Sequence, residues 1–330
     1  MTAKVGIPRG LFFYKLYPLW KTFFEELGTE VVVSDQTSKR ILDDGVKSCV
    51  DEACLPVKLF FGHVINLKGK VDYLFIPRLT SISRNEYICP KFGGLPDMIR
   101  NSFDNIPLVI DTEINLRKKK ENEIKAVLET GRYFSSDDAA IIKAYEKALE
   151  SYGNYKKQIE SGIFPGDIID KKLAVLKKPQ ENALNIAVIG HAYNLYDRYA
   201  NMDLLRKLKN MGVNPVTVEM LDSGEIDSYA KTLNKQMFWY FGRKAVGSAL
   251  SISNNENMNG IIYIMAFGCG VDSFVCDMAE RNVRNRRDIP YIVLTIDEHS
   301  GEAGLDTRLE AFIDMIRWRK KNEADVSAYG

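Results

Sequence analysis

Five cysteines are the residues of this chain with the most distinctive chemistry, and three of them share a local setting. Cys54, Cys89 and Cys269 each lie in a predicted loop, each has glycine or proline nearby, and each just precedes a predicted helix. The N–H groups and dipole at the start of a helix favour a thiolate at that position. On the residues alone two interpretations stay open: a metal site with three cysteine ligands, or three unrelated structural cysteines.

Iron–sulfur clusters are one kind of site that such cysteines could form. These clusters need thiolates together with backbone N–H donors that stabilise the cluster charge, and helix starts supply such donors. The other two cysteines, Cys49 and Cys276, are interpreted as packing residues. No C-x-x-C pair is present, so the zinc-ribbon and thioredoxin patterns are missing. Zinc bound by the three cysteines with His63 or His299 is an alternative.

The surroundings of Cys269 also permit a nucleotide-binding function. Gly268–Ser273 comes close to the dinucleotide fingerprint G-x-G-x-x-G/A, follows an apolar run and opens a helix predicted over 272–287, with Asp297 at the end of the next strand. Two observations argue against this interpretation. Ser273 stands where the fingerprint has a smaller residue, and a dinucleotide-binding turn would give Cys269 no role. The alternative is a nucleotide-binding α/β protein with structural cysteines. No G-x-x-x-x-G-K-[ST] loop is present, which argues against ATP bound in that manner.

A polar cluster follows the last predicted strand, 291–296. Glu298, His299 and Glu302 are candidate acid, base or ligand-orienting groups, because their loop neighbours Cys269 if the two strands are adjacent. The alternative is that these carboxylates only stabilise a helix start. Three cations on predicted loops at the edge of the site could bind an anionic group or remain solvated: Arg9, Arg78 and Lys91.

Strand and helix patterns alternate in both halves of the chain, which predicts parallel sheets. The predicted strands cover 4–8, 30–34, 71–77, 107–112, 184–190, 215–220, 260–266 and 291–296. A further short extended segment is permitted over 45–50, and 78–94 is expected to be a loop. We predict an α/β fold with two Rossmann-like (flavodoxin-like) lobes: 1–114, a helical segment and connector over 115–183, and 184–330. Such sheets bind ligands at the carboxyl ends of their strands.

The totals describe an ordinary globular chain. Its 330 residues suffice for two domains, 45% are hydrophobic, and the formal net charge is +1. Bulk charge therefore suggests neither a nucleic-acid nor a membrane partner. No apolar run approaches the ~18–20 residues of a membrane span, and the first residues lack a secretory pattern. We expect a cytoplasmic protein, in which an odd number of cysteines argues against a disulfide framework.

Six motifs together resemble one family. They are Gly6–Gly10 (GIPRG), Tyr17–Phe24 (YPLWKTFF), Asp51–Lys58 (DEACLPVK), Tyr87–Phe92 (YICPKF), Phe267–Phe274 (FGCGVDSF) and Thr295–Gly304 (TIDEHSGEAG). These motifs resemble the bacterial and archaeal proteins related to the 2-hydroxyacyl-CoA dehydratase and benzoyl-CoA reductase subunits, also described as acyl-CoA dehydratase activase-related. The resemblance covers nearly the whole chain.

The resemblance implies a [4Fe–4S] cluster between the lobes, held by Cys54, Cys89 and Cys269 with one iron open to a substrate or another ligand. It implies as partner a separate ATP-hydrolysing activase of the actin/Hsp70/sugar-kinase superfamily, which passes on low-potential electrons. Such an oxygen-sensitive protein would reduce or dehydrate a small substrate; the alternative is a non-catalytic cluster carrier, electron-transfer or assembly subunit of an ATP-driven complex. A double-cubane cluster would need Cys49 and Cys276 as further ligands, or two chains sharing a cluster. A homodimer is expected because relatives pair their cluster subunits.

Overall fold

The computed structural model describes residues 2–117, 121–171, 183–286 and 288–328. The chain forms two compact units: unit 1 contains residues 1–175 and 235–243, and unit 2 contains residues 176–234 and 244–330. Most of the connector predicted over 163–183, and residue 287 at the predicted end of the helix after Cys269, lie outside the described residues.

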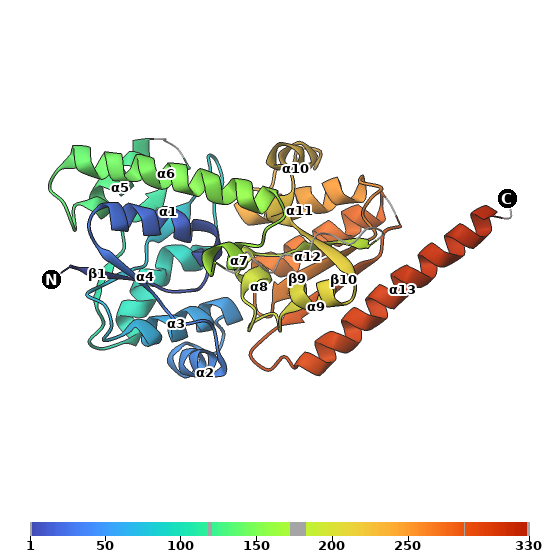
Figure 1. The fold of residues 1–330 in the computed structure, drawn as a ribbon, viewed down its shortest axis with the longest axis horizontal. Coiled ribbons are helices and arrows are strands. Elements are labelled where there is room, and N and C mark those ends of the chain that lie inside the picture. Colours follow the sequence, from blue (N-terminus) through green and yellow to red (C-terminus); the bar gives the residue numbers. More distant parts are fainter. Residues whose placement is uncertain (1, 118–120, 172–182, 287, 329–330) are drawn as a thin grey trace. The chain divides into compact units, whose positions relative to one another are not determined.

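Unit 1 alternates strands and helices as predicted (Figure 1). In chain order its elements are β1 (Lys4–Ile7), α1 (Phe13–Glu26), β2 (Glu30–Val33), α2 (Lys39–Ser48), α3 (Leu55–Leu67), β3 (Tyr73–Phe75), β4 (Arg78–Ser81), α4 (Pro90–Ser102), β5 (Leu108–Ile110), β6 (Glu113–Asn115), α5 (Glu121–Gly131), α6 (Asp138–Glu160) and α7 (Pro165–Ile169). The main sheet has the order β2-β1-β3-β5 and is parallel throughout. The predicted loop over 78–94 begins instead with β4, which pairs in parallel with β6.

Unit 2 repeats the same topology. Its elements are β7 (Leu184–Ile189), α8 (Ala192–Tyr196), α9 (Leu204–Asn210), β8 (Val213–Thr217), the 3₁₀ helix η2 (Val218–Met220), α10 (Ser223–Ala230), α11 (Tyr240–Ser253, of which residues 240–243 belong to unit 1), β9 (Gly260–Ala266), α12 (Gly270–Arg284), β10 (Tyr291–Ile296) and α13 (Glu302–Ala328). The sheet order is β10-β9-β7-β8, again parallel. In each unit the first strand lies between the second and the third, the flavodoxin-like order, so the predicted α/β fold class is confirmed.

Burial explains why these segments form these elements. β9 is buried along nearly its whole length, as expected for a central parallel strand with helices on both faces. In unit 1, α1 buries Trp20, Phe23 and Phe24 at helical spacing, and α6 lies alongside it (Figure 1). Among the described helices, none combines the length and the apolar character that crossing a membrane requires.

The α2–α3 pair corrects one sequence expectation. Residues 45–50, for which an extended segment was permitted, fall instead in α2 and its end, and α2 begins where Ser38 Oγ accepts a hydrogen bond from the Ile41 N–H. Two glycines explain the helix pairing. A Cβ on Gly45 would lie 1.9 Å from the Lys58 carbonyl oxygen, and a Cβ on Gly62 would lie 1.9 Å from that of Ile41. Only glycine permits so close an approach, which fixes the connection between the two helices.

We predict that Gly62→Ala lowers the free energy of unfolding by at least about 2 kcal/mol, because the new methyl group meets backbone that can move only with the whole helix. Gly153→Ala in α6 is the matched control, since a Cβ there meets nothing within 4 Å. That change should be neutral or stabilising by up to about 1 kcal/mol. Urea denaturation of both variants measures the difference, and equal stabilities would contradict the close α2–α3 contact.

Candidate functional site

The three cysteines predicted as ligands each occupy the position immediately before a helix. Cys54 is the N-cap residue of α3, Cys89 that of α4 and Cys269 that of α12. This part of the prediction is confirmed. Cys54 differs from the other two because it follows a helix, α2, and not a strand. At all three positions the free N–H groups and the dipole of the following helix favour negative charge on sulfur.

A positive side chain adds to this effect in unit 1. Lys91 Nζ lies 4.0 Å from Cys54 Sγ. Burial raises the pKa of the Cys49 thiol, although Lys58 and Lys91 act in the opposite direction, and this is in keeping with the interpretation of Cys49 as a packing residue. The Lys91 ammonium group beside Cys54 suits a thiolate at Cys54. All five cysteines of the chain lie within the described residues, and none of them forms a disulfide.

In unit 2, the strand order brings two strand exits together. β7 and β9 are neighbours, and the residue after each strand lies at the carboxyl edge of the sheet. Gly190 follows β7, and a Cβ there would lie 2.6 Å from the Ile264 carbonyl oxygen of β9. Gly268 follows β9 with φ +75°, a conformation that favours glycine, and turns the chain into α12. The two glycines thus set the positions of His191 and Cys269.

His191, Cys269 and Asp272 form a compact cluster at this edge. Their ligating atoms all lie within 4.8 Å of one another. His191 Nε2 is 3.2 Å from Asp272 Oδ1, which also accepts a 2.9 Å hydrogen bond from the Tyr263 hydroxyl. Asp272 is 3% exposed, and among the described residues its second oxygen, Oδ2, has no hydrogen-bond partner. A buried carboxylate oxygen without a donor is a ready ligand for a cation.

The electrostatics of the cluster follow from burial and charge. Burial alone lowers the pKa of His191, but the Asp272 carboxylate, and then Cys269, outweigh that effect and raise the pKa to about 10. Burial, followed by the charge of Asp272, raises the pKa of Tyr263. Nitrogen, sulfur and oxygen donors in one compact cluster, in which Asp272 is buried and the other two are half-buried, suit a first-row transition metal such as zinc or iron.

Two members of this cluster, His191 and Asp272, were missed by the sequence analysis. Asp272 was considered only within the glycine-containing fingerprint, and His191 was not considered at all. A signal for His191 was present, because it directly follows Gly190 at the end of a predicted strand, as Cys269 follows the end of β9. Applying the same rule to every strand exit would have found it.

The candidate residues Glu298, His299 and Glu302 follow β10. This strand is the neighbour of β9, with which it pairs in parallel over residues 291–296. Asp297 Oδ1 accepts hydrogen bonds from the His299 N–H and the Ser300 hydroxyl, and so shapes the turn. His299 is exposed, and Glu302 pairs with Lys207 at 2.7 Å. The catalytic roles suggested for Glu298, His299 and Glu302 remain predictions.

Other candidate residues have partners within their own unit. Arg9 pairs with Asp170 at 2.9 Å, and Arg78 pairs with Asp97 and Asp111. Their charges are therefore largely compensated. Burial raises the pKa of the Cys276 thiol to about 12, in keeping with its interpretation as a packing residue.

His63 is fully buried, and both ring nitrogens are engaged. Nδ1 is 3.0 Å from Ser34 Oγ, and Nε2 is 3.0 Å from Thr37 Oγ1. Neither nitrogen is turned to a cysteine, so the structure gives His63 a part in holding the segment after β2. Burial, and then the charge of Arg9, lower its pKa to about 3.

A family model matches residues 4–221, about two thirds of the chain, and is described as the CoA enzyme activase uncharacterised domain (DUF2229). The chain belongs to this family. The matched part of the CoA enzyme activase domain contains Cys54, Cys89 and His191, whereas Cys269 and Asp272 lie beyond it. A search of curated proteins finds no significant match.

The buried state of His63 predicts a pH dependence of stability. The unfolded chain binds a proton at His63 below pH 6.5, whereas the folded protein does not until about pH 3. Its contribution to stability is therefore complete above pH 6.5 and falls as the pH drops towards 3. From pH 7 to pH 5 the loss should be about 2 kcal/mol. Denaturation of the wild type and of His63→Gln at both pH values isolates this loss, and parallel pH profiles would refute it.

Proposed function

We propose that this member of the CoA enzyme activase domain family is an iron–sulfur protein of the 2-hydroxyacyl-CoA dehydratase/reductase type. Cys54, Cys89 and Cys269 would hold a [4Fe–4S] cluster and leave one iron open to a substrate. The observation that most supports the proposal is the N-cap position of each of these cysteines. At three such positions, backbone N–H groups of the following helix would stabilise the charge of a cluster bound through the sulfur atoms.

The donor set is chemically suited to this cofactor. The Lys91 ammonium group beside Cys54 would offset part of the negative charge of a thiolate-bound cluster. At Cys269, the His191 side chain supplies a hydrogen-bonding group beside the sulfur. In iron–sulfur proteins, hydrogen bonds to sulfur and nearby charge set the reduction potential. These residues therefore support both the binding and the tuning of the cluster.

The bound cluster would supply one-electron transfer at low potential. The proposed electron donor is an ATP-hydrolysing activase of the actin/Hsp70/sugar-kinase superfamily, a partner that accords with the activase-related family of this chain. The protein would then reduce or dehydrate a small substrate. The alternative within the same chemistry is a non-catalytic carrier that holds the cluster for an ATP-driven complex, with a double-cubane cluster as a variant. Turnover of small reducible molecules with activase and ATP separates the two.

We predict that anaerobic reconstitution yields a brown protein, and that Cys54→Ser, Cys89→Ser and Cys269→Ser each lose most of the bound iron because three thiolates hold one cluster. Iron and sulfide analysis, absorption and EPR spectra measure the loss. Cys49→Ser and Cys276→Ser are the controls and should keep their iron. A colourless wild-type protein would refute the cluster, and equal loss from Cys49→Ser would refute the ligand set.

A second candidate function is a mononuclear metal centre, which one observation favours. His191, Cys269 and Asp272 lie in the same unit with their ligand atoms within 4.8 Å, and Asp272 Oδ2 is buried without a partner among the described residues. Imidazole, thiolate and carboxylate together are a ligand set that zinc and divalent iron accept. Because both candidates use Cys269, they compete for the same thiolate.

His191 distinguishes the two candidates. If the mononuclear site exists, Co²⁺ should bind with thiolate-to-metal absorption, and His191→Ala should weaken binding at least about ten-fold, a loss seen even for groups that only orient metal ligands. Exposed His299 provides the control, as His299→Ala should bind Co²⁺ normally. A three-cysteine cluster should instead survive His191→Ala. Retained Co²⁺ affinity in His191→Ala would contradict the mononuclear site.

A further inference from the structure

Unit 1 contains a cavity that the proposed cluster chemistry does not use. It lies where the chain leaves β1 and β3, the two neighbouring strands at which the strand order of this sheet reverses. In open α/β sheets this is the position at which ligands bind. Pro8 and Gly10 after β1 and Ile76 and Pro77 after β3 contribute to its wall.

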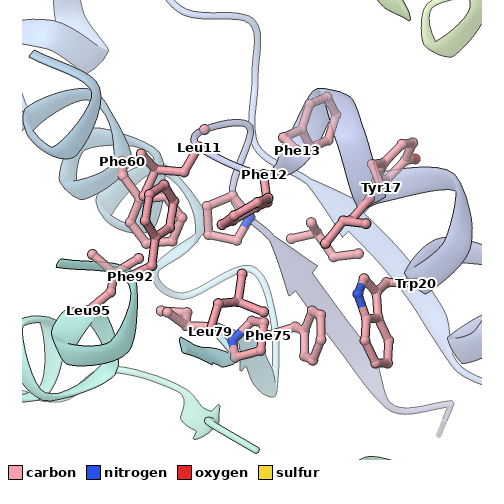
Figure 2. Close-up of a pocket in the computed structure, with 16 residues that line it drawn as sticks. Leu11, Phe12, Phe13, Tyr17, Trp20, Phe60, Phe75, Leu79, Phe92 and Leu95 are labelled. Carbon is pink, nitrogen blue, oxygen red and sulfur yellow. The ribbon is translucent and has the colours of Figure 1, made fainter. Parts of the chain in front are cut away.

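The wall of the cavity is apolar and aromatic (Figure 2). Helix α1 contributes Leu16 and Trp20, and Phe60 and Phe92 come from α3 and α4. No charged side chain of the described residues lines it. The tyrosine in the wall, Tyr17, stays neutral near pH 7, because burial, and then the charge of Glu25, raise its pKa to about 12. An occupant of this cavity is therefore uncharged.

One polar atom in the wall lacks a partner. Trp20 is 6% exposed, and among the described residues its indole Nε1–H has no hydrogen-bond acceptor. In Figure 2 this nitrogen lies on the side of the ring turned towards the other lining residues. A buried donor without an acceptor is costly, and an ordered water needs two to four polar partners, which so apolar a wall does not offer. The donor is placed to meet an acceptor on a ligand.

The size of the cavity limits how much of that ligand it can hold. Its volume is about 60 Å³, and it is partly open to the outside. Apolar cavities of about 150 Å³ hold benzene, so this one takes only a few heavy atoms of a ligand, and the rest of the ligand extends through the opening. We propose that the cavity binds the short, straight hydrocarbon chain of an uncharged carbonyl compound, whose oxygen accepts a hydrogen bond from Trp20 Nε1–H. This proposal is independent of the iron–sulfur cluster.

Two probes of equal length test the proposal on the full chain without any cluster. 2-Pentanone has a strong acceptor on a straight chain, and methyl propyl sulfide has a weak one. The three tryptophans give separate indole N–H signals in ¹H–¹⁵N NMR spectra, and Trp20→Phe identifies the Trp20 signal. We expect titration with 2-pentanone to shift this signal and the sulfide to bind more weakly. No shift of the Trp20 signal with either probe would overturn the proposal.

Two variants separate the hydrogen bond from the cavity. Trp20→Phe should weaken the binding of 2-pentanone about five-fold, since a net hydrogen bond contributes about that factor. The same change should leave the binding of methyl propyl sulfide nearly unchanged. Binding of both probes to this variant is followed on the NMR signals of the other lining residues. Leu16→Phe should fill the cavity and abolish both. Leu108→Phe, at a residue that is 58% exposed and outside the lining, is the control. Equal weakening of both probes by Trp20→Phe would refute the hydrogen bond, and unaltered binding to Leu16→Phe would refute the cavity.

Discussion

The side-by-side placement of the first and third strands of each sheet is the constraint on which the functional features depend. In a parallel sheet these strands end at the same edge, and the chain leaves them towards helices on opposite faces. A space therefore opens between the two exits. In unit 1 the exits of β1 and β3 border an apolar cavity, and in unit 2 those of β7 and β9 bring His191 and Cys269 together. One backbone arrangement thus serves two different chemistries.

The residues at the exits decide which chemistry results. In unit 1 the wall is built mainly from proline, leucine, isoleucine and aromatic side chains, which carry no charge. In unit 2 a half-buried histidine, His191, faces a buried aspartate, Asp272. Burying such a pair costs desolvation energy that their attraction only roughly offsets, and well-packed apolar residues would stabilise the fold as well or better. The hydroxyl group of Tyr263, a fully buried residue of β9, donates a hydrogen bond to the same carboxylate. A polar cluster of this kind is better explained by function than by stability.

Local rules were sufficient to predict much of this molecule. Apolar runs such as 260–266 and the alternation with amphipathic helices predicted the α/β class, and Pro56, two residues after Cys54, predicted a helix start there. Helix α2 was not predicted, and its packing against the predicted helix α3 depends on a contact between Gly45 and the Lys58 backbone that no local pattern reveals. The proximity of His191 to Asp272 was hidden for the same reason. It depends on which strands are neighbours, and strand order is a property of the whole sheet.

Cys269 is a proposed ligand both in the three-cysteine cluster and in the mononuclear metal centre. As one of three cluster ligands, its sulfur would lie beside His191, and a hydrogen bond from a neighbouring side chain tunes such a ligand. As one of three ligands to a single ion, it would share that ion with the imidazole and with Asp272 Oδ2. Both arrangements require the close approach of Gly190 to β9, because any side chain there would meet the Ile264 carbonyl group. The close backbone approach at this edge is therefore a requirement that both proposed arrangements share, and His191 would take part in either arrangement.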